Sequence, residues 1–324
     1  MRHITVSCAV LLSWTILHAQ WGAAQSYPDR PVKIVAGTAA GGQSDRLARL
    51  VAEGLERIWG EHVVVEAHPG ADGTIGADAV AHAAADGYTL LLAGQSNLAL
   101  VAAEGRAIRY DPIADFAPIG RIARVPLVLA VNVRVPASTL AELVAMAKAR
   151  PGTLTYGSTG VQSRLAAELL KSAEGLDIVE VPYKGTSAAL ADLLAARIDM
   201  VFFDASVVVP HADAGTLRLL AAAGARRVPG APAVPTLEEL GFRGIRVEPW
   251  YGLVAPGRTP PAVLARLRSA LAELRRAPSY RQQRRRLGYE PIDDSPEQFA
   301  AEIAADIERF AGVVKAAKLA GPPQ

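Results

Sequence analysis

VKIVAGTAAGGQSDRLARL, residues 32–50, changes character twice along its length, and each part predicts a different structure. The β-branched residues Val32, Ile34 and Val35 predict a short buried strand. The small residues at 37–42 then predict a loop that a guest molecule can approach closely, because few side chains stand in the way. The remaining residues have the apolar spacing of an amphipathic helix.

A strand, a small-residue loop and a helix in this order leave unpaired N–H groups at the start of the helix, beside the positive end of its dipole. Ser44 can cap the helix and Asp45 suits its first turn. Its predicted buried face contains Leu47, Leu50, Val51 and Leu55. An anion can bind at such a helix start. Ordinary turns share this pattern, and Gly41 with Gly42 does not match a dinucleotide-binding fingerprint. The rest of the chain must therefore decide whether this loop binds an anion.

The first 24 residues predict a signal peptide that is cleaved near Ala24, with a basic start at Arg2 and an apolar stretch at 4–17. This stretch is too short and too interrupted to predict a membrane span. The only cysteine, Cys8, lies in the same segment, where a lipoprotein anchor is an alternative whose flanking residues fit poorly. The mature chain would then have no disulfide and would depend on its core for stability.

The mature chain is long enough for two domains, and a hydrophobic content of 51% is sufficient for two cores. Removing Arg2 with the leader lowers the 34 Lys and Arg residues to 33, against 32 Asp and Glu. A net charge this close to zero does not indicate a nucleic-acid or membrane surface. An arginine cluster at 275–286 is the local exception, and its interleaved leucines favour a solvated helix face.

Strand and helix patterns alternate from residue 32 to residue 93, which predicts three parallel strands joined by right-handed crossovers. Ligands bind beyond the carboxyl ends of such strands, where the loop containing Gln95 and Ser96 follows the third strand. The chain is extended again at 119–131, and residues 132–138 have the composition of a hinge.

The same order of strand, small-residue loop and helix recurs at residues 154–173, with the helix expected to begin at Arg164. After a second extended segment near residue 246, the chain ends in amphipathic helices that we expect to return to the first unit. Ser295 and Gln298 predict a capping box at the start of the last helix. The predicted fold class is α/β, with two Rossmann-like lobes joined by two extended crossings. Residues 25–132 and 245–324 are predicted to form lobe 1, and residues 133–244 lobe 2. This is the organisation of a hinged ligand clamp.

Several segments of the mature chain match one family in combination. They are YPDRPVKIV with the following GG and SD, PGADG with its helix and DGYTLL, YDP, DFAPI, VPYKG, and WYGL before AP and TPP. Together they resemble the Bug-type solute-binding proteins of tripartite tricarboxylate transporters, from residue 27 to about residue 314. The resemblance implies a type II periplasmic-binding-protein-like receptor, located in the periplasm, that closes on a small carboxylate and is not an enzyme. It also implies membrane transporter subunits as partners, no cofactor, no metal and no nucleic acid, and we expect a monomer.

In this family two loops, one in each lobe, hold the ligand mainly through backbone amides and bridging water, which implies residues 38–45 and 157–164 here. The candidate ligand-binding residues are Thr38, Ala39, Ala40, Gly41, Gly42, Ser44, Asp45, Gln95, Ser96, Ser158, Thr159, Gly160, Ser163, Arg164, Tyr183 and Asp204. The second loop, GSTGVQSRLA, is shorter than is usual in the family, and Arg164 stands where a histidine is common. The ligand therefore stays open between a carboxylate, an aromatic acid, an amino acid and a neutral compound.

Individual candidates have alternative roles. Arg164 could form a charge-assisted pair with a carboxylate, or an ordinary surface pair with Glu168 four residues on. The Ser and Thr hydroxyls could cap their own helices instead. Asp45 or Asp204 becomes a ligand partner if the ligand carries an amine. At a lobe crossing, Tyr251 favours packing at the hinge over stacking on the ligand.

Two other function classes remain as alternatives. An exported hydrolase is a minor one, because the sequence GQSN at 94–97 faintly resembles a nucleophile elbow but Leu98 stands where glycine is required. The histidines of the mature chain show no metal-binding spacing. A ligand sensor that signals through a membrane partner is the second alternative, and the receptor sequence cannot separate it from a transport receptor.

Overall fold

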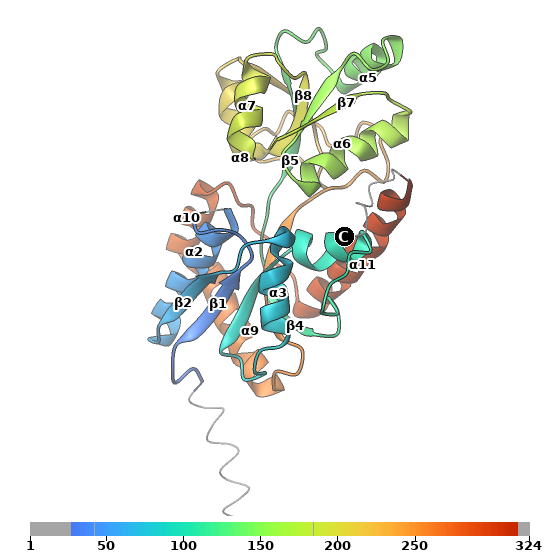
Figure 1. Ribbon diagram of the computed structural model, residues 1–324. Coiled ribbons are helices and arrows are strands. Elements are labelled where there is room, and N and C mark those ends of the chain that lie inside the picture. Colours follow the sequence, from blue (N-terminus) through green and yellow to red (C-terminus); the bar gives the residue numbers. More distant parts are fainter. Residues whose placement is uncertain (1–26, 42, 184, 317–324) are drawn as a thin grey trace, which may run out of the picture.

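The computed structural model describes residues 27–41, 43–183 and 185–316, which form two α/β lobes with a five-stranded mixed sheet in each (Figure 1). The fold class predicted from the sequence is confirmed. The predicted signal peptide and Cys8 lie outside the described residues. Among the residues that are described, no helix is both long and apolar enough to cross a membrane.

Lobe 1 has the strand order β2-β1-β3-β10-β4. The first strand, β1 (Val32–Ala36), is parallel to both of its neighbours, β2 (Val63–Ala67) and β3 (Thr89–Gly94), as the sequence predicts. The strand β10 (Trp250–Pro256) comes from the last quarter of the chain and pairs antiparallel with both β3 and β4 (Phe116–Arg124). The later part of the chain therefore completes the sheet that the first part begins.

The helices of lobe 1 cover both faces of this sheet (Figure 1). They are α2 (Gln43–Trp59), η1 (Ala71–Gly73), α3 (Thr74–Ala81), η2 (Ser96–Leu100), α4 (Val101–Ala103), α9 (Pro261–Arg276), α10 (Pro278–Arg286) and α11 (Pro296–Ala316). The predicted face of α2 is buried, with Leu47 and Val51 fully inaccessible. The predicted return of the C-terminal helices to lobe 1 is also confirmed, because α9 packs on α2 and β4 and α11 packs on β4.

Lobe 2 has the strand order β7-β6-β8-β5-β9. Here β6 (Thr155–Ser158) is parallel to β7 (Val179–Pro182) and β8 (Met200–Asp204), whereas β5 (Leu127–Asn132) is antiparallel to β8 and β9 (Leu217–Ala222). The helices are α5 (Leu140–Ala149), α6 (Val161–Glu174), α7 (Thr186–Leu194) and α8 (Ala205–Asp213). The helix α8 was not predicted from the sequence.

The boundary between the lobes differs from the prediction. The strand β5 pairs with strands of lobe 2, so residues 127–132 belong to that lobe and not to lobe 1. The hinge predicted at residues 132–138 is wrong, because Asn132 ends β5 and its side-chain amide donates to the Leu193 carbonyl over 2.7 Å. The chain crosses instead between β4 and β5, where the Val125 N–H donates to the Pro249 carbonyl of the returning segment over 2.7 Å.

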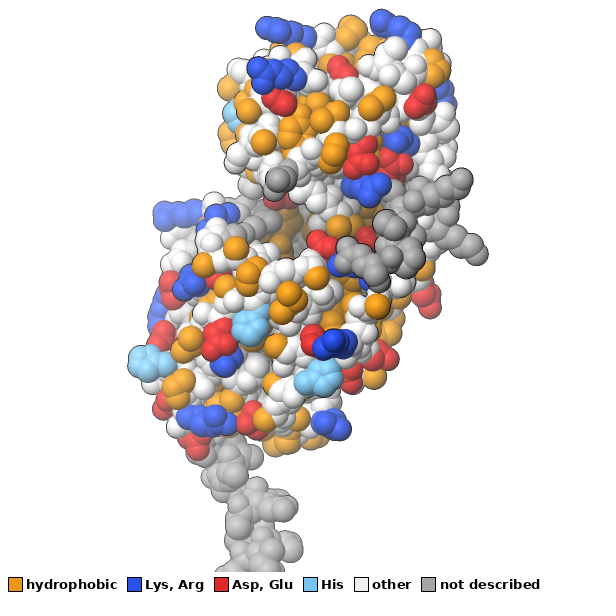
Figure 2. Space-filling model, in the orientation of Figure 1, with side chains coloured by type: hydrophobic (Ala, Val, Ile, Leu, Met, Phe, Trp, Pro, Cys, Tyr) orange, Lys and Arg blue, Asp and Glu red, His pale blue; other side chains and the backbone are white. Residues whose placement is uncertain are grey.

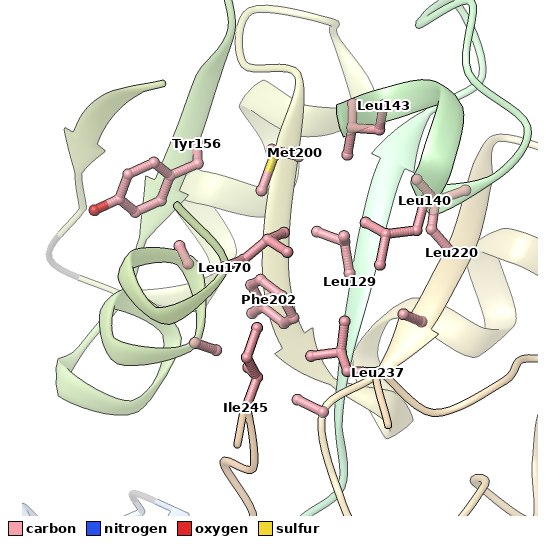
Figure 3. Close-up of a cluster of buried hydrophobic side chains, with 14 of the residues drawn as sticks. Leu129, Leu140, Leu143, Tyr156, Leu170, Met200, Phe202, Leu220, Leu237 and Ile245 are labelled. Carbon is pink, nitrogen blue, oxygen red and sulfur yellow. The ribbon is translucent and has the colours of Figure 1, made fainter. Parts of the chain in front are cut away.

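Lobe 2 has an apolar core on each face of its sheet, one against α7 and α8 and the other against α5 and α6 (Figure 3). Tyr156, Met200 and Phe202 point from the strands into the core beside α5 and α6 and are at most 1% exposed. The same cluster includes Leu100 of η2 and Phe310 of α11, which are elements of lobe 1. The two lobes therefore share an apolar contact beside the cleft, in addition to their two crossings.

The arginine cluster at 275–286 is only partly a solvated helix face. Arg284 is 4% exposed, and its guanidinium lies 5.6 Å from the ring centre of Tyr280. Arg275 is also largely buried and lies 3.7 Å from a carboxylate oxygen of Asp294. The interpretation as a solvated face is wrong for these two residues, because α9 and α10 hold them against β4, where they donate to the carbonyls of Arg121 and Ile122.

Candidate functional site

The loop between β1 and α2 is held by its own side chains. The Asp45 carboxylate accepts the N–H of Gly41 over 2.9 Å and pairs with Arg49 over 2.9 Å. The hydrogen bond from Arg49, together with that from Gly41, lowers the pKa of Asp45, whose side chain is 1% exposed. The Oγ atoms of Thr38 and Ser44 are 2.5 Å apart. These contacts give Asp45 a role in supporting the loop, while Gly42 lies outside the described residues.

Glycine is required where this loop begins. A Cβ at Gly37 would lie 2.7 Å from the Cα of Gly73, so the two backbones touch. The side chain of Asn97 lies beside both and accepts the Gly94 N–H over 2.8 Å. The loop after β1 is therefore packed against the segment before α3 and against the end of β3, which fixes its position in lobe 1.

Gln95 takes part in a buried polar cluster. Its side-chain amide donates to Asp306 over 2.8 Å, and the indole N–H of Trp250 donates to the same carboxylate oxygen over 2.8 Å. Asp306 is fully buried and also pairs with Arg309. The cluster joins β3, β10 and α11, so Gln95 connects elements of lobe 1 in this structure.

The loop after β6 runs directly into α6, which begins at Val161 rather than at the predicted Arg164. Ser163 therefore lies in the first turn of the helix. Its hydroxyl accepts the N–H of Thr159 over 2.8 Å and donates to the Gly160 carbonyl over 3.2 Å. This side chain therefore closes the loop on itself and does not cap α6.

A cavity of about 140 Å³ lies between this loop and the two chain crossings at Val125 and Pro249. Figure 2 shows the hollow between the lobes. The walls of the cavity are Val125, Leu127, Thr159, Gly160, Gln162, Ser163, Thr186, Phe202, Phe203, Asp204, Pro249 and Tyr251. Two helices, α6 and α7, begin at this cavity, and neither Gly160 nor Gly185, their N-cap residues, provides a side-chain cap. Backbone N–H groups in the first turn of such a helix need an external acceptor, and an anion is a suitable one.

Asp204 and Tyr251 face the same cavity from different lobes. Burial, followed by the negative charge of Asp204, raises the pKa of Tyr251 above its ordinary value. The Tyr251 ring lies edge to face with the Tyr289 ring, with ring centres 6.1 Å apart. The Tyr251 ring also packs against Gly94, where an added Cβ would lie 3.2 Å from its Cε1. Tyr251 thus packs at the hinge, as predicted, and its ring also forms part of the cavity wall.

A second cavity, of about 280 Å³, lies on the other side of Gly160. Its walls are Leu100, Glu104, Ser158, Gly160, Val161, Arg164, Leu165, Glu180, Pro182, Tyr183 and Val314. Arg164 pairs with Glu180, with Nε 3.2 Å from the carboxylate, and not with Glu168. Glu168 instead accepts the hydroxyl of Tyr156 over 2.6 Å. Leu100, Glu104 and Val314 belong to lobe 1, so this cavity also lies between the lobes.

The structure brings part of the predicted site together. Thr159, Gly160, Ser163 and Asp204 line the smaller cavity, and Ser158, Gly160, Arg164 and Tyr183 line the larger one. The described candidates that line neither cavity are Thr38, Ala39, Ala40, Gly41, Ser44, Asp45, Gln95 and Ser96. Within the described ranges, no group of three His, Cys, Asp or Glu side chains could hold a metal.

Some wall residues were missed by the sequence analysis. Thr186 is one of them. The segment around it shows the same pattern as the other two loops, in which a strand is followed by a small residue, here Gly185, and then by a helix. Gln162 was missed because α6 was expected to begin after it. Phe202 and Phe203 were also missed. They lie on a buried strand, and nothing in the sequence indicates that their side chains line a cavity.

A family model described as "Tripartite tricarboxylate transporter family receptor" matches residues 47–319. The chain is similar to protein BugT of Bordetella pertussis, at 36% identity over 295 residues that cover 90% of each chain. These matches extend through both lobes.

Solved structures are similar over the same length. Rpa4515 of R. palustris, solved with adipate, has a TM-score of 0.77 at 34% identity and covers 90% of this chain and 98% of its own. MatC of Rhodopseudomonas palustris, solved with bound malate, has a TM-score of 0.74 at 29% identity and covers 89% of this chain and 100% of its own. Both likenesses include the two lobes and the cleft between them.

Proposed function

Because this chain belongs to the tripartite tricarboxylate transporter receptor family, we propose that it captures a small carboxylate between its lobes and delivers it to a membrane transporter. The similarity to structures solved with adipate and malate supports a carboxylate as the ligand. The proposal covers a non-catalytic, monomeric receptor that is exported to the periplasm after loss of its first 24 residues.

One observation supports the ligand class above the others, namely the two uncapped helix starts at the smaller cavity. Each can supply N–H donors to a carboxylate, and a hydrogen bond to a charged group contributes about 1.5–3 kcal/mol. No buried cation is needed for this recognition.

The first loop has its place in the same mechanism. Residues 38–41 line neither cavity, so their contact with a ligand requires the lobes to approach each other. We propose that closure about the crossings brings this loop to the ligand carboxylate from lobe 1. The internal hydrogen bonds of the loop keep it in shape before the ligand arrives, which lowers the entropy cost of binding.

Isothermal titration calorimetry of the purified mature protein tests the ligand class. The panel contains acetate, propionate, malate, adipate, citrate, benzoate and the matching uncharged amides. We expect at least one acid to bind with micromolar affinity and its amide to bind at least 10-fold more weakly. Binding of the amides with equal affinity, or of no acid at all, would contradict the proposal. Uptake of the bound acid in a strain that lacks this receptor tests delivery to a transporter.

A backbone substitution tests the helix start directly. Thr186→Pro removes one N–H at the first residue of α7, a position where proline fits a helix. The loss of one hydrogen bond to a carboxylate predicts a 10- to 100-fold weaker affinity, from about 1.5–3 kcal/mol. Thr186→Ala keeps the N–H and is the matched control, with an expected change of less than threefold. Equal affinities for the two variants would exclude this N–H as a ligand contact.

A further inference from the structure

The larger cavity is separated from the smaller one by a residue without a side chain. Gly160 lines both cavities, and a Cβ placed on it would have no atom within 4 Å. The smaller cavity lies at the uncapped starts of α6 and α7, whereas the larger one lies between α6, β7 and the lobe 1 elements η2 and α11. A ligand that is bound at the helix starts can therefore extend past Gly160 into the larger cavity.

Most of the larger cavity has apolar walls. Its apolar wall residues are Leu100, Val161, Leu165, Pro182, Tyr183 and Val314. The volume of about 280 Å³ exceeds the roughly 150 Å³ in which a benzene ring is held inside a protein. The space is thus large enough for an aromatic ring or a branched aliphatic group.

The charged wall residues of the larger cavity already have partners within the protein. Both oxygens of Glu180 are engaged, Oε1 by the Ser158 hydroxyl at 2.6 Å and Oε2 by Nε of Arg164 at 3.2 Å. Glu104, on the lobe 1 side, lies 3.6 Å from Arg106, and burial raises its pKa. The two wall carboxylates and the single wall guanidinium leave no excess of positive charge for a second ligand anion.

We propose that the cognate ligand is a monocarboxylic acid with an apolar, ring-sized body, whose carboxylate lies at the helix starts and whose body fills the larger cavity. This inference rests on the proposed function, since it places the carboxylate where that function places it. Gly160 borders both cavities, so a short linker joins the carboxylate to the ring. Burial of the ring supplies affinity that a short acid lacks.

Calorimetry with three acids tests the inference on the mature protein. The probes are propionate, 3-phenylpropionate and adipate, which place a methyl group, a ring and a second carboxylate in the larger cavity. We expect 3-phenylpropionate to bind at least 30-fold more tightly than propionate and at least 10-fold more tightly than adipate. Tightest binding of adipate, or equal binding of propionate and 3-phenylpropionate, would overturn the inference and leave the proposed carboxylate receptor intact.

A matched pair of variants locates the ring. Val161→Trp fills the larger cavity from the first turn of α6, and Val179→Trp places the same side chain on the exposed face of β7, where Val179 is 46% exposed. We expect Val161→Trp to weaken 3-phenylpropionate binding at least 10-fold and Val179→Trp to leave it within threefold of the wild type. An unchanged urea midpoint shows that each variant is folded. An equal effect of both variants on 3-phenylpropionate would overturn the inference.

Discussion

Asp45 gives the most informative single substitution, because a ligand role and a structural role predict different results. In the structure its buried carboxylate accepts the Gly41 N–H and pairs with Arg49. Asp45→Ala removes a hydrogen bond to a charged group, about 1.5–3 kcal/mol, and leaves the N–H without its acceptor. The pair with Arg49 adds little to this, because the Arg49 side chain is 54% exposed. We therefore expect a loss of about 3 kcal/mol in the free energy of unfolding.

Urea unfolding of the mature protein without ligand, followed by tryptophan fluorescence, measures this loss. The two tryptophans of the mature chain, Trp59 and Trp250, both lie in lobe 1, so their signal reports on the lobe that contains Asp45. Arg49→Ala is the matched control and should cost clearly less than Asp45→Ala, because it leaves the Gly41 bond in place.

The pH dependence gives a second measurement of the same contact. The pKa of Asp45 is lowered in the folded protein by Arg49 and Gly41, so its stabilisation is complete above the unfolded value of about 3.9. It is lost as the pH falls through the lower, folded pKa. The difference between the wild type and Asp45→Ala should thus stay constant from pH 7 to about pH 4 and shrink below that pH. A difference that is absent at pH 7, or no larger than that of Arg49→Ala, would refute the structural role.

Three further substitutions test the packing of the lobes. Phe202→Ala removes a ring that is 1% exposed and should lower the free energy of unfolding by about 3–5 kcal/mol, so an unchanged urea midpoint would contradict its place in the core. Asp306→Ala leaves Arg309 without its buried partner and should cost about 3–5 kcal/mol, measured in the same way; a cost below about 1 kcal/mol would argue against the pair. Gly37→Ala places a Cβ 2.7 Å from the Cα of Gly73, which should cost about 1–3 kcal/mol of stability and shift the loop after β1. Calorimetry should then show weaker ligand binding. Unchanged affinity would show that this loop does not contact the ligand.

Much of the fold could be predicted because local pattern and tertiary structure agree. The alternation of strands and helices before residue 94 gave three parallel strands, and the helix α2 buries the predicted face. The capping box at α11 is also present, with the Gln298 N–H donating to the Ser295 hydroxyl over 3.2 Å and the Ser295 N–H to Gln298 over 2.8 Å. In these segments the residues that decide the structure are close in sequence.

The boundary between the lobes could not be found in this way. Residues 119–131 form one apolar, extended pattern, yet Val125 and Pro126 divide it into strands of two different sheets. Hydropathy does not change at this point, because both strands are buried. Only the pairing of β5 with β8 and β9, which are distant in sequence, assigns it to lobe 2.

The candidate site stays a prediction, and the structure brings only one of its loops to the cavities. The loop after β6 lines both of them, whereas the described residues of the loops after β1 and β3 line neither. The sequence could not show that the hydroxyl of Ser163 closes its own loop or that Arg164 pairs with Glu180. Such choices depend on partners that only the folded chain brings near.

The position of β10 has a consequence for the order in which the chain can fold. Because β10 lies between β3 and β4, the first lobe consists of two separate sheet fragments until residue 256 has been synthesised. All the strands of the second lobe lie between residues 127 and 222, and its core is completed by Leu237 and Ile245, so this lobe can form before β10 joins the two amino-terminal fragments. A nascent chain interrupted after residue 249 should thus contain one protected lobe and one protease-sensitive half, and pulse proteolysis of stalled chains would reveal that asymmetry.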